Sequence, residues 1–375
     1  MGIVYDSKDT AVERVKLFGM AQYQIGHVDG TDSAGSSFSD THEEFRRIWL
    51  GGDVKFKNGL YFKTVLSVTQ GENAATGDQD IEFQHFRNLY LAYDFSKANS
   101  DFSGYDRFEI GYGRRSLKLA DEWQRSAYLI NTVERSPFSN KLWPTDEGGS
   151  HPVGAWIRVA QGKDDFQIGL FSTSHDDTFP GWDDGTVIYS EWTHDLTDGS
   201  GLDLMEAVFS GYTQNANSTE NKLARGNEWG GSAILRLQKG PWEFHSTFGA
   251  GENSEFNNAN RDGNFWGASF MPMVWLVEDK VKFVSRYQYQ HASSIEGIRL
   301  NSRYARSAGA RGEADMSLSG GRGDRHHNFY LGLNYFFCGD NMKIVSGIDY
   351  DDIETRSGIN VFKGWTASSA FRFYF

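Results

Sequence analysis

Five basic residues occupy comparable positions in five short segments whose apolar and polar residues alternate. They are Arg47, Lys63, Arg158, Arg236 and Arg286, and each lies opposite the apolar residues of its own segment. A guanidinium group offers a planar fork of donors that binds phosphate or carboxylate, and an ammonium group offers a compact positive charge. The pattern predicts a polar surface that attracts anions, with Glu109 and Glu228 adding acids to the same surface.

A second group of charged residues lies in the segment 117–150. It comprises Asp121, Glu122, Arg125, Glu134, Arg135 and Lys141, so the two signs are nearly balanced. Apolar residues recur at helical spacing at Leu119, Trp123, Ala127 and Ile130, which predicts a helix with one apolar face that must pack on something. Ser136-Pro137 and Trp143-Pro144 are expected to break the chain after it.

Patterns typical of enzymes and metal sites are missing from the sequence. His326-His327 has no third ligand at metal-binding spacing, and no GxSxG motif is present. Paired aspartates such as Asp164-Asp165 and Asp176-Asp177 lack the DxDxDG spacing of a calcium loop. We therefore expect no enzyme activity, no metal and no cofactor, although a Ser–His pair on an outer surface stays open for the histidines in strand segments (His85, His194 and His245).

The elements that must position these residues alternate with period two, which is typical of half-buried strands. About sixteen such segments occur, near 14–26, 44–57, 60–71, 82–95, 106–116, 152–161, 165–175, 185–196, 202–214, 227–238, 241–251, 264–277, 280–291, 326–337, 342–352 and 361–375. An even number of strands in a chain of 375 residues fits one large closed barrel, so we expect a single domain over 1–375.

The connections between these segments alternate between short and long. Tight turns are predicted at 57–59, 162–164, 197–201, 238–240, 277–280 and 338–341, and long polar loops at 27–43, 117–150, 215–226, 252–263 and 292–325. An outer-membrane barrel has short periplasmic turns and long outside loops. The loop 117–150 then lies either in the lumen as a constriction loop or outside as a cap, and its length and apolar stripe favour the lumen.

The composition is compatible with a membrane barrel and excludes several other classes. Mean hydropathy is −0.55 and no apolar run approaches the roughly 18 residues of a membrane helix. Aromatic residues make up 15% of the chain, with 42 Gly and only 6 Pro, which suits a large closed sheet. The single cysteine, Cys338, excludes an internal disulfide, and the net charge of −13 argues against nucleic acid.

The last residues read AFRFYF, which places Phe371, Phe373 and Phe375 on one face of a strand. We expect these rings to face lipid, and the pattern resembles the C-terminal recognition signal of bacterial outer-membrane barrels. The loop 292–325 is expected to be extracellular and carries six arginines: Arg299, Arg303, Arg306, Arg311, Arg322 and Arg325. These arginines are compatible with an anion-attracting vestibule, with lipopolysaccharide binding, with pairing to acidic loops, or with a solvated loop.

Several motifs resemble the phosphate-selective porin O and P family, in the right order over nearly the whole chain. They are Phe45-Arg46-Arg47 with Leu50-Gly51-Gly52, Ile110-Gly111-Tyr112-Gly113-Arg114, Val133-Glu134-Arg135-Ser136, Arg286-Tyr287 and Leu331-Gly332-Leu333-Asn334-Tyr335. The resemblance implies a sixteen-stranded porin, usually trimeric, in a Gram-negative outer membrane. It also implies a ladder of arginines and a few lysines on the pore wall, only part of which is traceable here.

The leading hypothesis is a passive outer-membrane porin for small hydrophilic solutes and inorganic anions, probed most directly by its ion selectivity. Five basic wall positions against few acids predict a weak to moderate anion preference, with phosphate as one candidate and no tight phosphate site. Two alternatives stay open. One is a barrel that acts mainly as a surface-binding or adhesive protein with an occluded lumen, and the other is a soluble all-β binding protein.

Overall fold

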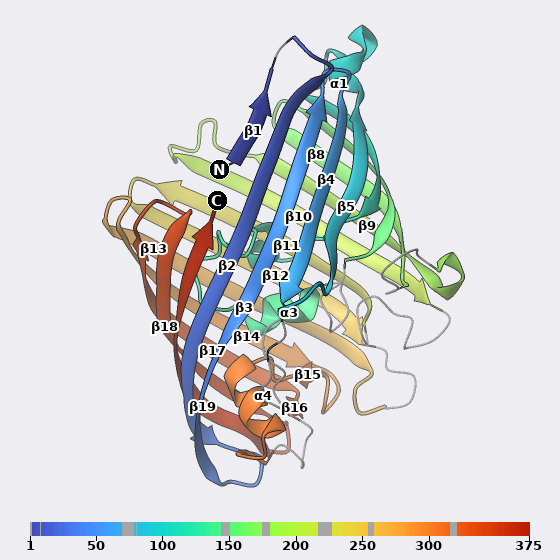
Figure 1. Ribbon diagram of the computed structural model, residues 1–375. Coiled ribbons are helices and arrows are strands. Elements are labelled where there is room, and N and C mark those ends of the chain that lie inside the picture. The colour runs from blue at the N-terminus through green and yellow to red at the C-terminus, as the bar shows by residue number, and fades with distance from the viewer. Residues whose placement is uncertain are drawn as a thin grey trace.

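The computed structural model is a single antiparallel β-barrel (Figure 1). The structure describes residues 2–7, 9–69, 79, 81–143, 151–174, 181–216, 227–253, 259–315 and 321–375. Its strands are β1 (Gly2–Asp6), β2 (Val12–Thr31), β3 (Ser37–Phe56), β4 (Leu60–Thr69), β5 (His85–Asp94), β6 (Arg107–Arg114), β7 (Val153–Gln161), β8 (Asp164–Ser172), β9 (Gly185–Asp195), β10 (Leu204–Ala216), β11 (Asn227–Lys239), β12 (Trp242–Asn253), β13 (Gly263–Val277), β14 (Val281–Ala292), β15 (Ile298–Arg299), β16 (Arg322–Gly323), β17 (Arg325–Phe336), β18 (Met342–Glu354) and β19 (Asn360–Tyr374).

The described residues also form six short helical segments. They are α1 (Phe95–Ala98), η1 (Ser100–Phe102), α2 (Asp121–Gln124), α3 (Pro137–Leu142), η2 (Trp182–Asp184) and α4 (Arg303–Ala310). Among the residues described, none of these helices has the length and apolar character needed to cross a bilayer.

Sixteen strands close the barrel, because β2–β14 and β17–β19 pair in sequence order and β19 pairs with β2. Every pairing in this ring is antiparallel, so the predicted strand count and topology are confirmed. The short strand β1 lies outside the ring and pairs with the beginning of β2. This strand was not predicted, because it has only five residues and four of them are exposed.

Alternation along the strands separates a lipid-facing exterior from a polar lumen. In β17 exposed Phe329, Leu331 and Leu333 alternate with buried Asn328 and Asn334. Exposed aromatic rings gather near both ends of the wall: Trp229, Trp266 and Trp365 toward the long loops, and Trp242, Phe337 and Phe375 toward the short turns. An apolar band flanked by aromatic residues is how strands meet a bilayer, so the barrel is transmembrane and not soluble.

The C-terminal rings lie on this exterior, as predicted. Phe371, Phe373 and Phe375 are exposed, and backbone hydrogen bonds of 3.1 and 3.2 Å join Phe375 to Gly19 of β2. A Cβ on Gly19 would lie 2.5 Å from the Phe375 ring, so this glycine provides the space in which the ring packs. The last residue therefore closes the barrel by both backbone pairing and ring packing.

Replacing Phe375 with Asp is expected to reduce the amount of assembled barrel in cells severalfold. The change puts a charge on the lipid face beside the closing strand pair, which costs about 1 kcal/mol or less at the interface, and it removes the ring that packs on Gly19. Heat-modifiable migration of the membrane fraction on gels would measure folded barrel. Tyr350→Asp, on the outer face away from the closure, is a control for charge on the lipid face; equal amounts of folded barrel in wild type and F375D would contradict the prediction.

One predicted loop is mostly strand in the structure. The predicted loop 27–43 is mostly strand, because β2 continues to Thr31 and β3 begins at Ser37, which leaves a turn of five residues. The polar residues that suggested a loop there alternate between the lumen and the exterior of a barrel that rises above the membrane. Parts of the other predicted loops (144–150, 217–226, 254–258 and 316–320) lie outside the described residues.

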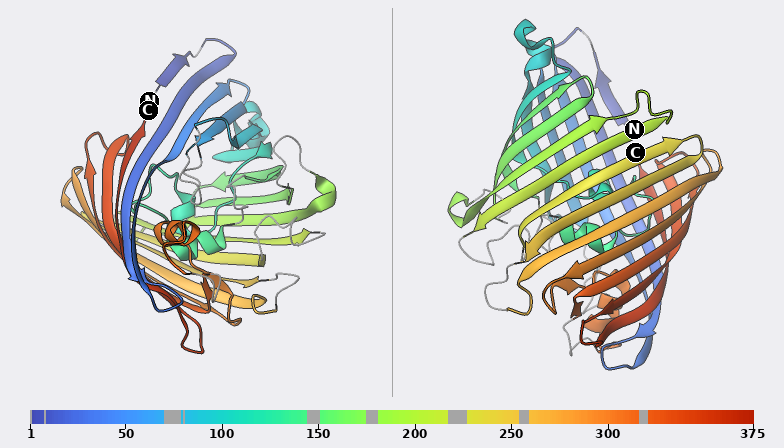
Figure 2. Two further views of the ribbon diagram at one scale, coloured as in Figure 1. Left: turned by 60° about the horizontal axis from the view of Figure 1, so that its bottom comes forward. Right: turned by 180° about the vertical axis from the view of Figure 1, so that it is seen from behind.

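Two segments fold from the long-loop end into the barrel, as seen from that end in Figure 2. The first, here called the inner loop, comprises residues 115–143 and includes α2 and α3. Its helices contact the lumen side of β11–β14. The second, here called the mouth segment, comprises residues 293–315 and includes α4, which contacts β2 and β3. The predicted extracellular loop 292–325 is therefore partly packed inside the rim.

Candidate functional site: the lumen and its inner loop

The inner loop contains less helix than the apolar spacing predicted. Only Asp121–Gln124 and Pro137–Leu142 are helical, whereas Leu119, Ala127 and Ile130 lie in irregular chain. Their side chains are buried nonetheless. The apolar spacing therefore indicated which residues are buried, although these residues do not form a continuous helix. Ser136-Pro137, which was expected to break the chain, instead begins α3: Ser136 caps it by accepting a hydrogen bond from Ser139 N, and Pro137 occupies the first turn.

Small residues on the barrel wall receive the inner loop. A Cβ added to Gly267 would lie 2.6 Å from the Phe138 ring, and one on Gly249 would lie 2.7 Å from Leu142. The backbone N–H of Phe138 also donates to Gln288 Oε1 at 2.7 Å. Glycine inside a strand marks such close approaches. The role of these wall glycines was not predicted from the sequence, because glycine at these positions does not disturb the alternating pattern.

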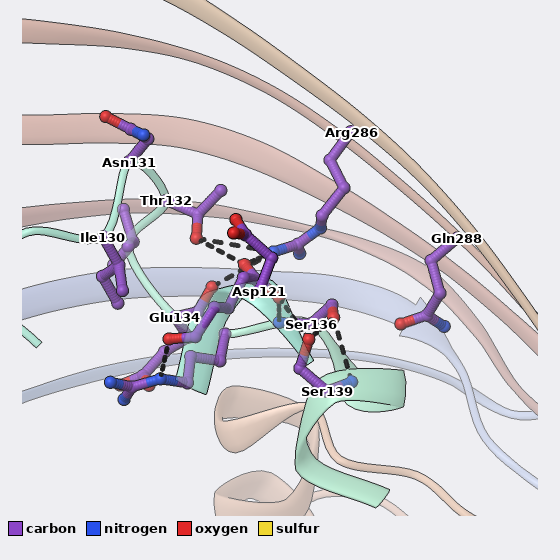
Figure 3. A network of polar contacts seen from close by, with 12 residues as sticks. Asp121, Ile130, Asn131, Thr132, Glu134, Ser136, Ser139, Arg286 and Gln288 are labelled. Carbon is purple, nitrogen blue, oxygen red and sulfur yellow. Dashed lines mark hydrogen bonds and ion pairs between the residues drawn. The ribbon is translucent and has the colours of Figure 1, made fainter. Parts of the chain in front are cut away.

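A buried network of polar contacts ties the inner loop to the wall, and Figure 3 shows Arg286 reaching from the wall toward Thr132, Ser136 and Ser139 of the loop. Glu122 connects these residues. Arg286 of β14 donates to Glu122 Oε1 at 2.7 Å and reaches Asp349 of β18 at 3.2 Å. Within the loop, Ser136 N and Ser139 Oγ donate to Glu122 Oε2 at 2.7 and 2.8 Å. Burial alone would raise the pKa of Glu122, but Arg286 and these donors overcome it and hold the pKa below its usual value.

Asp121 makes a second anchor on the neighbouring strands. Arg236 Nε of β11 lies 2.5 Å from Asp121 Oδ1 and also pairs with Glu206, while His245 Nδ1 lies 2.9 Å from Asp121 Oδ2. Arg125 is 3.8 Å from the same carboxylate. Through these two anchors the predicted wall cations Arg286 and Arg236 are bound to acids of the inner loop.

Glu134 makes a third anchor, to Arg46 and Arg47 on β3. Arg46 Nε lies 2.8 Å from one carboxylate oxygen and Arg47 Nη2 lies 3.3 Å from the other. Burial would raise the pKa of Glu134, but the two arginines hold it well below its usual range. The neighbouring Arg135 donates to the carbonyls of Glu122 and Arg125 and lies 3.8 Å over the Trp123 ring.

Two β-bulges direct additional arginines into the lumen. Strict alternation would put Arg46 and Arg47 on opposite faces, but the β2–β3 register skips Arg46, which lets both reach Glu134. The β4–β5 register likewise skips Arg87. The Arg87 guanidinium lies 4.2 Å over Trp49 and 3.4 Å from His151 Nε2. Bulges re-aim side chains in this way, and alternation alone does not reveal them.

The remaining predicted residues have distinct surroundings. Arg158 donates to Asp165 of the adjacent strand at 2.8 Å, and Lys141 donates to Asn227 at 2.8 Å. Lys63 lies 5.7 Å over the Phe18 ring and has no ion pair within 4.0 Å in the described chain. The structure therefore brings Arg47, Arg236 and Arg286 to the inner loop and leaves Lys63 and Arg158 on the wall away from it.

Cations in the two halves of the lumen differ in their partners. On β11, β14 and β18 they are paired with carboxylates, as in Lys282–Glu243 at 2.7 Å and Lys343–Asp340 at 2.6 Å. Six half-buried cations on and just after β2–β6 have no ion pair within 4.0 Å among the residues the structure describes: Lys16, Lys55, Lys63, Arg87, Arg107 and Arg115. The positive charge of the lumen is therefore least neutralised beside β2–β6.

Three of the six unpaired cations line an open cavity. A cavity of about 300 Å³ at the short-turn end is lined by residues of β2–β7, including Lys55, Arg107 and Arg115. On the side where the cations are paired, the space between Arg286 and the mouth segment is only about 30 Å³. The inner loop thus fills one side of the barrel and leaves room on the side with the unpaired cations.

The mouth segment is held on the inner rim by two ion pairs and one ring. Arg303 pairs with Glu44 and Arg311 pairs with Asp40, both on β3. The Tyr304 ring lies against Gly26 of β2, where an added Cβ would be 2.4 Å from it. Arginines of the loop 292–325 were expected to bind anions, lipopolysaccharide or acidic loops, or to be solvated. In the described part of this loop they pair with acidic residues, and these acids belong to a strand and not to a loop.

Replacing Gly26 with Val is expected to displace Tyr304 and to release the mouth segment from the rim. Valine suits the extended backbone of β2, so the barrel itself should fold normally. Single-channel conductance should rise and become noisier as the segment moves. Gly231→Val, where the nearest atom to the added Cβ is 3.6 Å away, is the control; identical currents from all three proteins would show that the mouth segment does not obstruct ion flow.

Metal and enzyme sites were also sought in the lumen. In the described ranges no group of three or more His, Cys, Asp or Glu residues is placed to hold a metal ion. His245 lies beside Asp121, and His194 is 2.7 Å from Asp164. In the described chain these two histidines therefore contact aspartates and not a serine that could act as a nucleophile. Asp165 pairs with Arg158, and Asp176-Asp177 lies outside the described residues.

Comparison with known proteins places the fold among bacterial porins. The anion-selective porin of Comamonas acidovorans superimposes with a TM-score of 0.59 at 11% identity, covering 96% of this chain and 99% of that one. OprB of Pseudomonas putida gives 0.56 at 11% identity over 96% and 94%, and OmpT of Vibrio cholerae gives 0.52 at 12% over 99% and 100%. No family model matches the chain, and no curated protein sequence matches it.

These likenesses concern the fold, because sequence identity is low throughout. The closed ring of sixteen strands, the lipid-facing band and the alternation of short turns with long connections are together the architecture of barrels in the outer membrane of Gram-negative bacteria. The short-turn end, with both termini near it in Figure 1, is then the periplasmic end. The chain is a porin-like outer-membrane barrel with an inner loop.

Proposed function

We propose that this barrel is a passive channel for small hydrophilic solutes with a weak to moderate preference for anions. The observation that carries the proposal is the set of unpaired cations along β2–β6 beside an open cavity. Charges in a narrow channel with low-dielectric walls act more strongly on ions than the same charges in bulk water. The net charge of −13 has less influence, because exposed charges beyond about 8 Å are screened at physiological salt.

Inorganic anions, including phosphate, are proposed as solutes without a tight phosphate site. The resemblance to the phosphate-selective porin O and P family supports phosphate, since Arg46, Arg47 and Arg135 match its motifs. In this chain Glu134 neutralises part of that cluster and Arg135 is occupied by backbone carbonyls. An anion there must compete with a carboxylate that is already in place, which favours weak binding.

The proposal is tested by single-channel recording in planar bilayers under a KCl gradient. We expect the reversal potential to shift from zero toward the equilibrium potential of chloride. We also expect the channel to be open at low voltage. A potential on the potassium side would contradict anion preference. A barrel that inserts but passes no current would contradict the channel itself.

The absence of current would favour the second candidate, a surface-binding barrel with an occluded lumen. One observation supports that candidate: the inner loop lies within the lumen, and the mouth segment packs on the inner rim at the long-loop end. Conductance therefore separates the two functions in the same experiment. An enzymatic function is not proposed, since the described lumen residues are explained by ion pairs and loop anchoring.

We also propose a homotrimer surrounded by outer-membrane lipid and lipopolysaccharide. An apolar groove of about 620 Å³ on the exterior joins β2 and β3 to β14 and β17–β19, and its lining includes the small residues Ser346, Ala367 and Ser369. Light scattering in mild detergent should give the mass of three chains of 42.3 kDa. Replacing Ala367 with Trp should reduce the trimer fraction at least tenfold, and a wild-type monomer in several detergents would contradict the proposal.

A further inference from the structure

The cavity at the periplasmic end combines two features that a channel for inorganic ions does not need together. The first is charge: its lining contains six basic residues (Arg14, Lys55, Lys97, Arg107, Arg115 and Arg158) and three acidic ones (Glu13, Asp94 and Glu109). Three of the bases already have carboxylate partners, at 3.8 Å for Arg14–Asp53, 3.6 Å for Lys97–Asp94 and within hydrogen-bond distance for Arg158–Asp165. Lys55, Arg107 and Arg115 have none in the described chain.

The second feature is a continuous aromatic wall on the same cavity. Tyr61 and Tyr90 both line it with their ring centroids 6.0 Å apart, and Tyr90 meets Trp156 edge to face at 5.3 Å. The guanidinium carbon of Arg115 lies 4.6 Å from the centroid of the Trp156 ring. Trp156 thus packs beside this guanidinium, which has no carboxylate partner within 4.0 Å in the described chain.

The same combination recurs further along the lumen. Lys16 and Lys63 both lie over the Phe18 ring, at 5.4 and 5.7 Å, and Arg87 lies over Trp49 at 4.2 Å. Four of the six unpaired cations, Lys16, Lys63, Arg87 and Arg115, thus have an aromatic ring beside them. A chloride or phosphate ion gains from the cations alone, whereas a ring-bearing anion gains from both.

We propose that the cavity is a weak binding subsite for aromatic carboxylates, which pass the channel in preference to aliphatic carboxylates of similar charge. This inference rests on the proposed function and names the solute class for it. The carboxylate group takes the free edge of Arg115 with Lys55 or Arg107 nearby, and the ring lies against Tyr61 and Tyr90. Asp94 and Glu109 reduce the net positive charge, which keeps binding weak enough for release, as conduction requires.

The test is block of the chloride current by benzoate, cyclohexanecarboxylate and acetate in wild-type channels. Benzoate should reach half-block at a roughly three- to tenfold lower concentration than acetate, the range that one aromatic contact supplies. Cyclohexanecarboxylate, which has similar bulk without a flat ring, should lie closer to acetate. Equal block by benzoate and cyclohexanecarboxylate would overturn recognition of an aromatic ring.

Variants separate this inference from the proposed function. Tyr61→Ser should bring the benzoate and acetate values together, while Lys55→Gln and Arg115→Gln should weaken block by both anions severalfold. Lys57→Gln is the matched control, because Lys57 is exposed in the turn after β3 and does not line the cavity. Equal block by benzoate and acetate in an anion-preferring wild-type channel would overturn the inference alone, whereas a cation-preferring channel would overturn both proposals.

Discussion

Replacing Lys63, Arg87 and Arg115 together with glutamine is expected to convert the channel from anion preference to cation preference. None of the three has an ion pair within 4.0 Å in the described chain, so their charge acts on mobile ions without a local counter-charge. A unit charge about 8 Å from an ion changes its energy by ~0.5 kcal/mol in water before screening. Because cations and anions respond oppositely, we expect the permeability ratio to change about twofold per charge, or roughly eightfold for three.

The reversal potential under a KCl gradient measures this change. The matched control replaces Lys57, Lys163 and Lys239 with glutamine, which removes the same total charge from exposed positions at the short turns. The control should shift the potential only slightly. Equal shifts in the two triple variants would show that total charge, and not the lumen wall beside β2–β6, sets selectivity.

Single changes on the wall test the earlier residue assignments. Arg47→Ala and Arg158→Ala should both move the potential toward cations, because Glu134 and Asp165 then have fewer positive neighbours. Glu134 keeps Arg46 as a partner, so the Arg47 variant should show the smaller shift. An unchanged potential in both would mean that neither side chain faces the conducting path.

Strand positions could be read from the sequence because a barrel wall repeats one local rule. Alternation, an even strand count and the rhythm of short and long connections placed nearly every strand within a few residues of its observed bounds. The exceptions have physical causes. At their long-loop ends β2 and β3 are mostly polar apart from the buried Val28 and Phe38, so the apolar alternation becomes too sparse to read before the strand hydrogen bonds end.

The partners of the charged residues could not be read in the same way. Alternation assigns a side chain to a face, but it does not say that Arg286 reaches Glu122, which is 164 positions away in the sequence. It also fails at bulges, where one extra residue moves Arg46 and Arg87 into the lumen. The wall glycines that receive Phe138 and Tyr304 carry no charge or periodicity of their own, so only the three-dimensional packing reveals their role.

Removing the positive partner of Glu122 is expected to be the most destabilising single change in the lumen. Arg286 is 3% exposed and Glu122 is 4% exposed, so Arg286→Met leaves a buried carboxylate without its cation. Breaking a buried pair from one side costs about 3–5 kcal/mol. The exposed pair Arg325–Glu354 offers the control, because Arg325→Met should cost only ~0–1 kcal/mol. Urea unfolding in detergent micelles, followed by tryptophan fluorescence, measures both.

A second substitution distinguishes an unpaired charge from lost packing. In Arg286→Met/Glu122→Gln the buried group is neutral and still hydrogen-bonds to the Ser136 N–H and the Ser139 hydroxyl, so stability should be partly restored. No recovery in the double variant would mean that Arg286 acts through its contacts with Asp349 and Asn328 instead.

The pH dependence of the free energy of unfolding should change sign in Arg286→Met. In the wild-type chain burial raises the pKa of Glu122. Arg286 and Ser136 lower this pKa by a larger amount, so the net shift is downward. A lowered pKa in the folded state contributes stability that is present above the ordinary value and is lost as the pH falls through the folded-state value. The contribution of Glu122 should therefore be constant over roughly pH 5 to 8.

In Arg286→Met only burial and the loop's own donors act on Glu122, and we expect burial to prevail and raise its pKa above the unfolded value. A raised pKa contributes stability that is present at low pH and is lost as the pH rises through the folded-state value. The free energy of unfolding of the variant should thus increase more steeply as the pH is lowered toward about 5 than that of Arg286→Met/Glu122→Gln, in which Asp349 also lacks Arg286 but Glu122 no longer titrates. Parallel pH profiles for the two variants would show that Glu122 stays charged without Arg286, held by the hydrogen bonds of the inner loop alone.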